Sequence, residues 1–233
     1  MAITATLLTS GASDTDADSY ATASITPPAN ELIVVDVLNT DTVTPATPTL
    51  SGNGLTWVEI ATVTFDTIAT PKRRLTRFRS MGASPSAGAI TITAASSTGC
   101  GWVVSSFSGV DTSRANGSGA VVQSARNSAN AAASLNVALA AFADAVNNVA
   151  LGAHATDSTI SLVVGAGFTE LAEATITLPG SSLQTEYKVG EDTSVDASAS
   201  AGTPDWGGIA MEIKIAAAAA AFAPRLALLG VGR

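Results

Sequence analysis

Three aspartates near the amino terminus have the spacing of ligands in a calcium loop. Asp14, Asp16 and Asp18 alternate along the chain, and alternating carboxylates in such a loop converge on one hard cation. The pattern then fails, because Ser19 stands at its sixth position instead of glycine and Ile25 at its twelfth instead of glutamate. We therefore expect a solvated acidic loop here, no bound metal and no required cofactor.

Nucleophilic catalysis would depend on one histidine, His154, and one cysteine, Cys100. A serine triad could include His154 and Asp157, but the sequence has no G-x-S-x-G turn to present the serine. Cys100 has no C-x-x-C partner, and no second histidine could complete a zinc site. We predict that the chain is not an enzyme and that Cys100 is a small buried side chain.

The cations are concentrated in one short stretch, residues 72–79. At strand spacing, Arg73, Arg77 and Arg79 project from the same face. One interpretation is a solvated sheet face or edge that is guarded by charge. The other is a docking stripe for an acidic protein surface or for sugar carboxylates, and on that interpretation these three arginines are candidate interaction residues.

The three tryptophans, Trp57, Trp102 and Trp206, could stack against a sugar. Their placement at matching points of an internal repeat, described below, favours packing in the core instead.

Composition narrows the fold class and the partners. Of the 233 residues, 46% are hydrophobic and only 13% are charged, and threonine, serine and glycine dominate the remainder, which is typical of strands and tight turns. The net charge of −8 argues against nonspecific binding to nucleic acid or to an anionic membrane, since both need clustered cations.

Membrane insertion and secretion are not expected either. The longest apolar run, residues 215–223, is far shorter than the roughly 20 residues of a membrane span. Residues 1–13 lack the basic segment and the apolar segment of a secretion signal. A single cysteine permits no intramolecular disulfide, and we therefore expect synthesis in a reducing cytoplasm.

An internal repeat organises the chain. The apolar run at residues 30–41 recurs at 147–157, and the Gly-aromatic segment at 52–65 recurs at 165–178. Each copy continues with a segment that has an aromatic residue between charged ones (77–79 and 186–188) and ends in a strand that begins with tryptophan (102–107 and 206–215). We interpret residues 28–108 and 144–215 as two related β-units that share one core.

The predicted fold is all-β: one antiparallel, jelly-roll-like sandwich domain over residues 1–215, with a polar connection between the units at 109–132. Alternation of apolar and polar residues, bounded by turn signals, predicts the strands. They are expected at 3–8, 20–25, 32–37, 58–65, 72–79, 89–93, 102–107, 135–139, 149–155, 160–164, 169–177, 183–189, 195–199 and 209–215.

Residues 216–233 follow the last predicted strand and form an apolar arm. Pro224 prevents one continuous helix, so we expect an extended or kinked peptide that docks onto a neighbouring subunit. The candidate interaction residues of this arm are Phe222, Leu226, Leu228, Leu229 and Val231.

The segments ITPPANELIVVDVLN, GLTWVEIAT, WVVSSFSGVDTS and WGGIAMEIKIA, in this order, resemble a β-sandwich domain of structural proteins in tailed bacteriophages and related prophages. The resemblance covers residues 20–215 and concerns the pattern of strands and turns. It implies a virion component, such as a capsid decoration, tail or fibre module, and it carries over no functional residue.

Two classes of function follow. The first is a non-enzymatic virion structural protein, most simply a capsid decoration or cement protein, which is made in the host cytoplasm and binds other virion subunits and itself. The second is a tail, baseplate or fibre component, or a carbohydrate-binding module that faces the host surface. A glycan is therefore left open as a partner.

Overall fold

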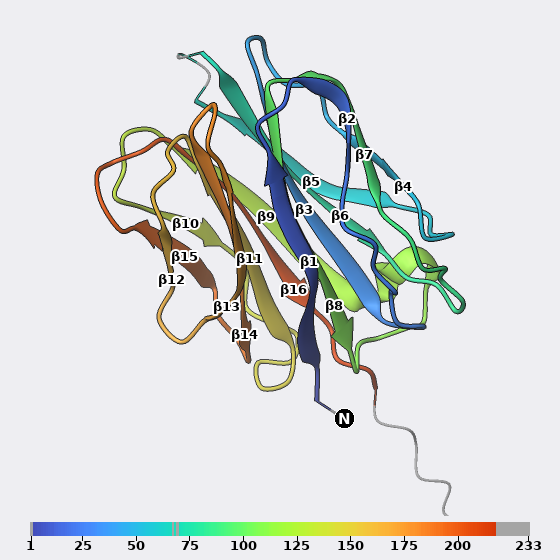
Figure 1. Cartoon of the computed structure of the whole chain (residues 1–233). Coiled ribbons are helices and arrows are strands. Elements are labelled where there is room, and N and C mark those ends of the chain that lie inside the picture. Colours follow the sequence, from blue (N-terminus) through green and yellow to red (C-terminus); the bar gives the residue numbers. More distant parts are fainter. Residues whose placement is uncertain (1, 67, 69, 218–233) are drawn as a thin grey trace, which may run out of the picture.

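The computed structural model describes residues 2–66, 68 and 70–217, in which the regular secondary structure is almost all strand (Figure 1). The candidate residues Phe222, Leu226, Leu228, Leu229 and Val231 lie outside the described residues. The strands are β1 (Thr4–Ser13), β2 (Ala17–Ala21), β3 (Leu32–Asp41), β4 (Thr49–Ser51), β5 (Val58–Phe65), β6 (Lys72–Ser80), β7 (Thr91–Ser97), β8 (Gly99–Ser108), β9 (Val121–Ala129), β10 (Ser134–Ala138), β11 (Val149–Thr156), β12 (Leu162–Val164), β13 (Thr169–Ile176), β14 (Ser181–Val189), β15 (Ser194–Ala199) and β16 (Trp206–Ile213), and a 3-10 helix, η1 (Ala115–Ala120), precedes β9.

The strands form two large sheets and two small ones, and all of the pairs between them are antiparallel. The large sheets have the orders β1-β8-β3-β6-β5 and β9-β16-β11-β14-β13, and the small sheets have the orders β2-β7-β4 and β10-β15-β12. Adding eight to each strand number of the first pair of sheets gives the second pair. The prediction of an antiparallel all-β sandwich fold is confirmed, and the two halves of the chain have the same topology.

Each half starts two strands earlier than the sequence repeat suggested. Strands β1 and β2 precede residue 28, and β9 and β10 precede residue 144. Strand β9 lies within residues 109–132, the segment expected to connect the units, where residues 120–123 have a strand-like pattern. The first unit thus runs from β1 to β8 and the second from β9 to β16.

The four sheets are stacked as layers, with a small sheet on the outside of each large one. Apolar side chains of β2 and β7 pack on one face of the first large sheet, and those of β10, β12 and β15 pack on one face of the second. The other faces of the large sheets pack against each other. Each unit therefore has its own core, and a third core joins the units, where we had expected one shared core.

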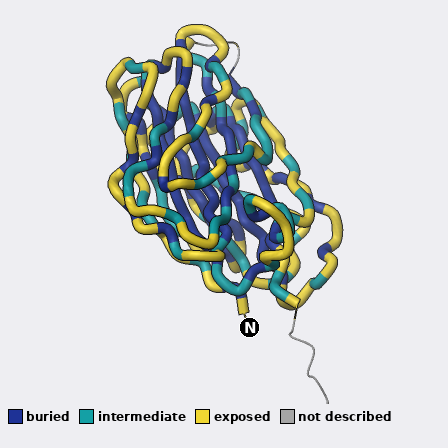
Figure 2. Tube along the Cα trace, turned by 90° about the vertical axis from the view of Figure 1, so that its right-hand side faces the viewer, coloured by how far each residue is buried: buried dark blue, intermediate teal, exposed yellow. Residues whose placement is uncertain are grey.

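This stacking explains why the central strands are apolar along almost their whole length. All residues of β3, β11 and β16 are buried, because each of these strands is covered on both faces. Figure 2 shows the buried segments of the chain in the interior of the molecule and the exposed segments around them.

The register of the strands makes the packing of the units nearly symmetric. One row across the first large sheet contains Val63, Leu75, Leu38 and Gly101. The matching row of the second sheet contains Ala174, Leu183, Ala155 and Gly207. Contacts between the two large sheets follow the same equivalence. Strand β1 lies against β13, and their equivalents β9 and β5 also lie against each other. The two units are thus related by an approximate twofold axis.

Glycine is required at one point of this interface. A Cβ atom on Gly207 would lie 2.3 Å from Cδ1 of Phe65, far inside normal contact distance, so a side chain there would displace the phenyl ring. The equivalent Gly101 faces Ile176, which occupies the position of Phe65 in the second unit.

Candidate functional site

The most polar part of the interface between the units is an ion pair between Asp36 of β3 and Arg77 of β6. Arg77 donates from Nε to Asp36 Oδ1 (2.7 Å) and from Nη2 to Oδ2 (3.0 Å). The side chains are 1% and 0% exposed. The second unit completes the site, because Thr185 Oγ1 donates to Asp36 Oδ2 (3.1 Å) and the carbonyl of Leu151 accepts from Arg77 Nη1 (2.9 Å).

This ion pair belongs to the first unit only. The row that contains Asp36 and Arg77 is matched in the second unit by one in which Ala153 pairs with Thr185. An alanine and a threonine therefore replace the charged pair at the equivalent positions. The asymmetry lets the second unit supply the remaining hydrogen-bond partners, which a buried ion pair requires.

Arg73 is a second buried link between the units. Its Nε donates to Ser181 Oγ (2.8 Å) and its Nη2 to the carbonyl of Gly180 (2.9 Å), both in the second unit. Its Nη1 donates to the carbonyl of Pro71 (2.6 Å) and forms an ion pair with Asp66. Burial lowers the pKa of Arg73, and the neighbouring Asp66 opposes that shift.

The third arginine of the predicted stripe, Arg79, is half-buried, and its Nη1 donates to the carbonyl of Asn116. Arg73, Arg77 and Arg79 do share one face of β6, but that face is turned toward the second unit. This corrects both sequence interpretations, the solvated face and the exposed docking stripe. The physical reason is that Arg73 and Arg77 find acceptors in the second unit that replace water, and Arg79 finds one in η1.

Three carboxylates meet beside Arg73. One carboxylate oxygen of each of Asp66, Asp157 and Asp205 lies within 4.8 Å of the other two. Among the described residues, these three form the group of side chains that could hold a metal ion. Asp157 Oδ1 accepts from the amide of Asp205 (2.9 Å), and Asp205 Oδ1 accepts from the amide of Ala131 (2.7 Å). These oxygens could bind a cation, but the guanidinium of Arg73 already supplies a positive charge to the group.

The predicted weak calcium ligands behave differently. Asp14, Asp16 and Asp18 are all exposed, and they are not part of the acidic group found among the described residues. Asp14 Oδ1 accepts a hydrogen bond from the amide of Thr177 (2.8 Å) and so joins the end of β1 to the second unit.

A buried pair of titratable groups lies in the core of the second unit. His154 and Glu186 are both fully buried, and their Nδ1 and Oε1 atoms are 3.6 Å apart. Glu186 Oε2 accepts from the amide of Gly165 (3.0 Å). Burial raises the pKa of Glu186 to about 8, and burial together with the charge of Arg77 lowers the pKa of His154 to about 4.

Both groups are therefore neutral near pH 7. The Oε1 atom of Glu186 has no hydrogen-bond partner among the described residues, and the backbone of Val195 beside His154 opposes the fall in the pKa of its imidazole. Asp157, the acid that a serine triad with His154 would include, belongs instead to the carboxylate group beside Arg73. Because His154 is enclosed, a substrate could not reach its imidazole in this structure.

The tryptophans do not form an exposed platform. Trp206 is fully buried and its Nε1 donates to the carbonyl of Ala132 (2.7 Å). Trp102 is buried and Trp57 is half-buried against the core of the first unit. Cys100 is also buried, as predicted, and burial raises the pKa of its thiol.

The two tryptophans that begin the closing strands are not at equivalent positions. Trp102 pairs with Val37 on β3, whereas Trp206 pairs with Thr156 on β11. In the register that matches Gly101 with Gly207, the equivalent of Trp206 is Cys100. Both indole rings still point into the core of their own unit.

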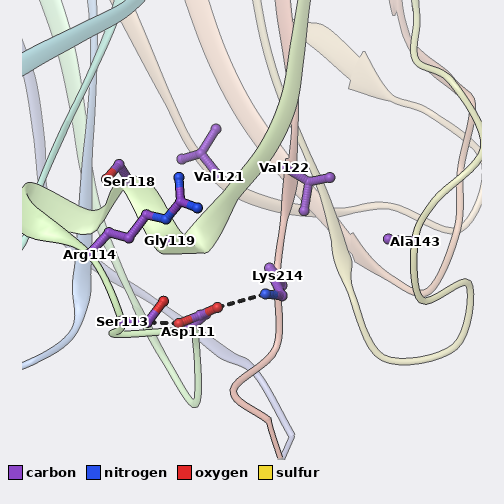
Figure 3. A pocket seen from close by; sticks show the side chains of 9 residues that line it. All are labelled: Asp111, Ser113, Arg114, Ser118, Gly119, Val121, Val122, Ala143 and Lys214. Carbon is purple, nitrogen blue, oxygen red and sulfur yellow. Dashed lines mark hydrogen bonds and ion pairs between the residues drawn. The ribbon is translucent and has the colours of Figure 1, made fainter.

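A surface hollow of about 380 Å³ lies where β16 ends (Figure 3). Lys214 binds Asp111 on its floor (2.7 Å), and this bond, with those from Ser113, lowers the pKa of Asp111 to about 2. Arg114 lies along one side of the hollow, and Val121 and Val122 line the other. Lys214 and Asp111 thus neutralise each other within a hollow that is lined by both polar and apolar residues.

No family model, curated protein or solved structure matches the chain. Over the described residues there is no helix of sufficient length and apolar character to cross a membrane.

Proposed function

We propose that this chain is a non-enzymatic structural protein of a bacteriophage virion, most simply a capsid decoration or cement protein. In this proposal it is made in the host cytoplasm, and residues 216–233 bind neighbouring virion subunits. The alternative within the same class is a tail, baseplate or fibre component. The proposal rests on the resemblance in sequence and on the roles of the residues that carry it.

The observation that carries the proposal is that these residues have structural roles in the strands and turns. Asn53, before the GLTW segment, has a positive φ of 58°, and its side chain donates to the carbonyls of Ser86 and Gly88 (3.0 Å each). Asn30, before the LIVVDVL strand, has a φ of 58° and donates from its amide to the carbonyl of Gly82 (2.8 Å). A resemblance carried by such residues favours a shared architecture over a shared reaction.

The buried charges support the same interpretation. Arg73, Arg77 and Asp36 hold the two units together, and the enclosed His154 and Glu186 lie in the core of the second. The first three residues thus connect the two units, and the last two are enclosed within one unit. These roles within the body favour a structural protein.

The last described residues are fixed at one end of the body, and in this proposal residues 218–233 bind a neighbour. The amide of Ala216 donates to the carbonyl of Gly109 (2.8 Å), and Ile215 pairs with Val110. Gly109 in turn lies beside Ala2, so that the start of β1 and the end of the described chain lie at the same end of the molecule (Figure 1).

The test uses particles of the phage or prophage that encodes the chain. Full-length protein and a variant that lacks residues 218–233 are each added to particles from which this protein has been removed, and bound protein is measured after sedimentation. We expect the full-length chain to bind at a fixed ratio to the major capsid subunit and the truncated chain not to bind. Equal binding of both would contradict the role of residues 218–233, and no binding of either would contradict the virion assignment.

A further inference from the structure

Strand β1 is an open edge of the first large sheet. Its one hydrogen-bonded neighbour is β8. Among the described residues, no turn or side-chain hydrogen bond reaches the backbone of Thr4–Ser13 from elsewhere. About half of the backbone N–H and C=O groups of such a strand point away from its partner. These groups are available to another strand.

The equivalent edge strand of the second unit, β9, is tied to neighbouring segments through its side chains. The side chain of Gln123 donates to the carbonyl of Ala140 (3.0 Å) and accepts from its amide (2.9 Å). Asn127 Nδ2 donates to the carbonyl of Asn136 (2.8 Å), and Arg126 Nη1 donates to the carbonyl of Thr62 (2.5 Å). The approximate twofold axis thus provides an internal comparison, in which side chains anchor β9 to neighbouring segments, whereas among the described residues no side chain of residues 4–12 in β1 forms a hydrogen bond.

Charge also distinguishes β1 from the other edges of the large sheets. Strand β5 carries Glu59, β9 carries Arg126, and β13 carries Glu170 and Glu173. Strand β1, with the sequence TATLLTSGAS, has no charged residue and no proline, and its Leu7 is 40% exposed. Natural proteins usually protect long edge strands with such residues because an open edge pairs with other chains.

We propose that β1 is an interface at which a second copy of this chain adds its own β1. The two strands run antiparallel across a twofold axis, and the two large sheets become one continuous sheet. A second copy fits this edge because an uncharged strand can meet itself without placing like charges together, whereas the chain as a whole has a net charge of −8.

The exposed leucine of β1 places this axis. Leu7 is 40% exposed and ends the regular stretch that begins at Thr4, because the register with β8 shifts between Leu7 and Thr9. With the axis at Leu7, the exposed leucines of both copies meet and become buried.

The experiment compares two single substitutions in the full chain. Leu7→Lys places a cation at the proposed contact, and Val122→Lys places the same cation on β9, where Val122 is 42% exposed. Dissociation constants are measured by sedimentation equilibrium and by native mass spectrometry. We expect a wild-type dimer, an unchanged dimer for Val122→Lys, and a Kd raised by about 100-fold for Leu7→Lys, since one buried leucine per copy is lost.

A mixture of Leu7→Lys with Leu7→Asp provides the matching rescue. If the leucines face each other across the axis, opposite charges restore pairing, and the mixture forms heterodimers at a concentration at which each variant alone is monomeric. A monomeric wild-type chain, a Leu7→Lys variant that dimerises like wild type, or equal loss in Val122→Lys would overturn the proposal. Circular dichroism and thermal unfolding establish that each variant is folded. This test leaves residues 218–233 intact, so its outcome is independent of the particle-binding experiment.

Discussion

Replacing Arg77 by leucine should destabilise the protein strongly. The substitution leaves the carboxylate of Asp36, which is 1% exposed, with the hydroxyl of Thr185 as its remaining side-chain partner in the second unit. It also removes the hydrogen bond to the carbonyl of Leu151. Breaking a buried ion pair from one side costs about 3–5 kcal/mol, because an uncompensated charge stays buried.

Removing both charges should cost much less than removing one. In the double variant Asp36→Leu with Arg77→Met, no charge is left in the interface, and apolar replacements of similar volume are often neutral or stabilising for buried pairs. The second unit already has the uncharged residues Ala153 and Thr185 at these positions. We therefore expect the double variant to regain most of the free energy of unfolding lost in Arg77→Leu.

Urea unfolding measures these differences. Tryptophan fluorescence and far-ultraviolet circular dichroism should be followed together, since two units could unfold separately and a single free energy requires one transition. Arg114→Met, at an exposed arginine, is the control and should change the free energy of unfolding by less than about 0.5 kcal/mol. A loss below about 1 kcal/mol in Arg77→Leu, or a double variant as unstable as the single one, would refute this account of the interface.

Three further predictions concern the cores and the acidic group. Trp206→Ala should lower the free energy of unfolding by about 3–5 kcal/mol, and Trp57→Ala by less, because Trp57 is half-buried; equal effects in thermal or urea unfolding would contradict this difference. The pKa of Glu186 is raised from 4.5 to about 8, so the free energy of unfolding should fall as pH rises from 4.5 through 8. The pKa of His154 is lowered from 6.5 to about 4, so the free energy of unfolding should also fall as pH drops from 6.5 through 4. Urea titrations across this range should therefore show a maximum at about pH 5–6, and Glu186→Gln, but not the exposed Glu59→Gln, should remove the decline on the alkaline side; an unchanged decline in Glu186→Gln would assign it to other groups. Chelator and added calcium should both leave the melting temperature unchanged, whereas a calcium-dependent rise that Asp205→Asn abolishes and Asp16→Asn does not would identify the three-carboxylate group as a cation site.

Sequence patterns predicted the central strands because burial on both faces leaves a simple signal. The run LIVVDVL became β3, and the Gly-aromatic segments became the turns before β5 and β13. The order of features in the repeat corresponds to the shared order of strands in the two large sheets. Such signals are local, because a strand that is buried on both faces has apolar residues at consecutive positions.

The first strand of the second unit, β9, was harder to find, whereas β10 corresponds to the strand predicted at 135–139. The segment that forms β9, VVQSARNSA, is polar over most of its length, because it lies at an edge and faces solvent. It also shares little sequence with its counterpart β1. Its equivalence to β1 becomes visible only when the order of strands in the sheets is known.

The buried arginines could not be assigned from composition, since arginine is mostly exposed in proteins. Their burial depends on residues that are distant in sequence: Arg77 meets Asp36 and Leu151, and Arg73 meets Ser181. One signal was present, namely a single aspartate, Asp36, within an otherwise apolar strand. A buried carboxylate needs a cation or several donors, and the nearby basic strand could have supplied the cation.

The acidic group beside Arg73 gave no sequence signal at all. Asp66 follows β5, Asp157 follows β11 and Asp205 precedes β16. Pairing of Thr156 with Trp206 brings the last two together, and the packing of the large sheets adds the first. A spacing rule applied along the chain cannot find ligands that three separate segments supply.

The claim that this chain is a virion structural protein is tested most directly by counting it in intact particles. Quantitative mass spectrometry of gradient-purified virions gives the number of copies per major capsid subunit. The account predicts a fixed, stoichiometric ratio that survives repeated purification. A chain that is missing from purified particles but abundant in the soluble fraction of the same lysate would contradict it.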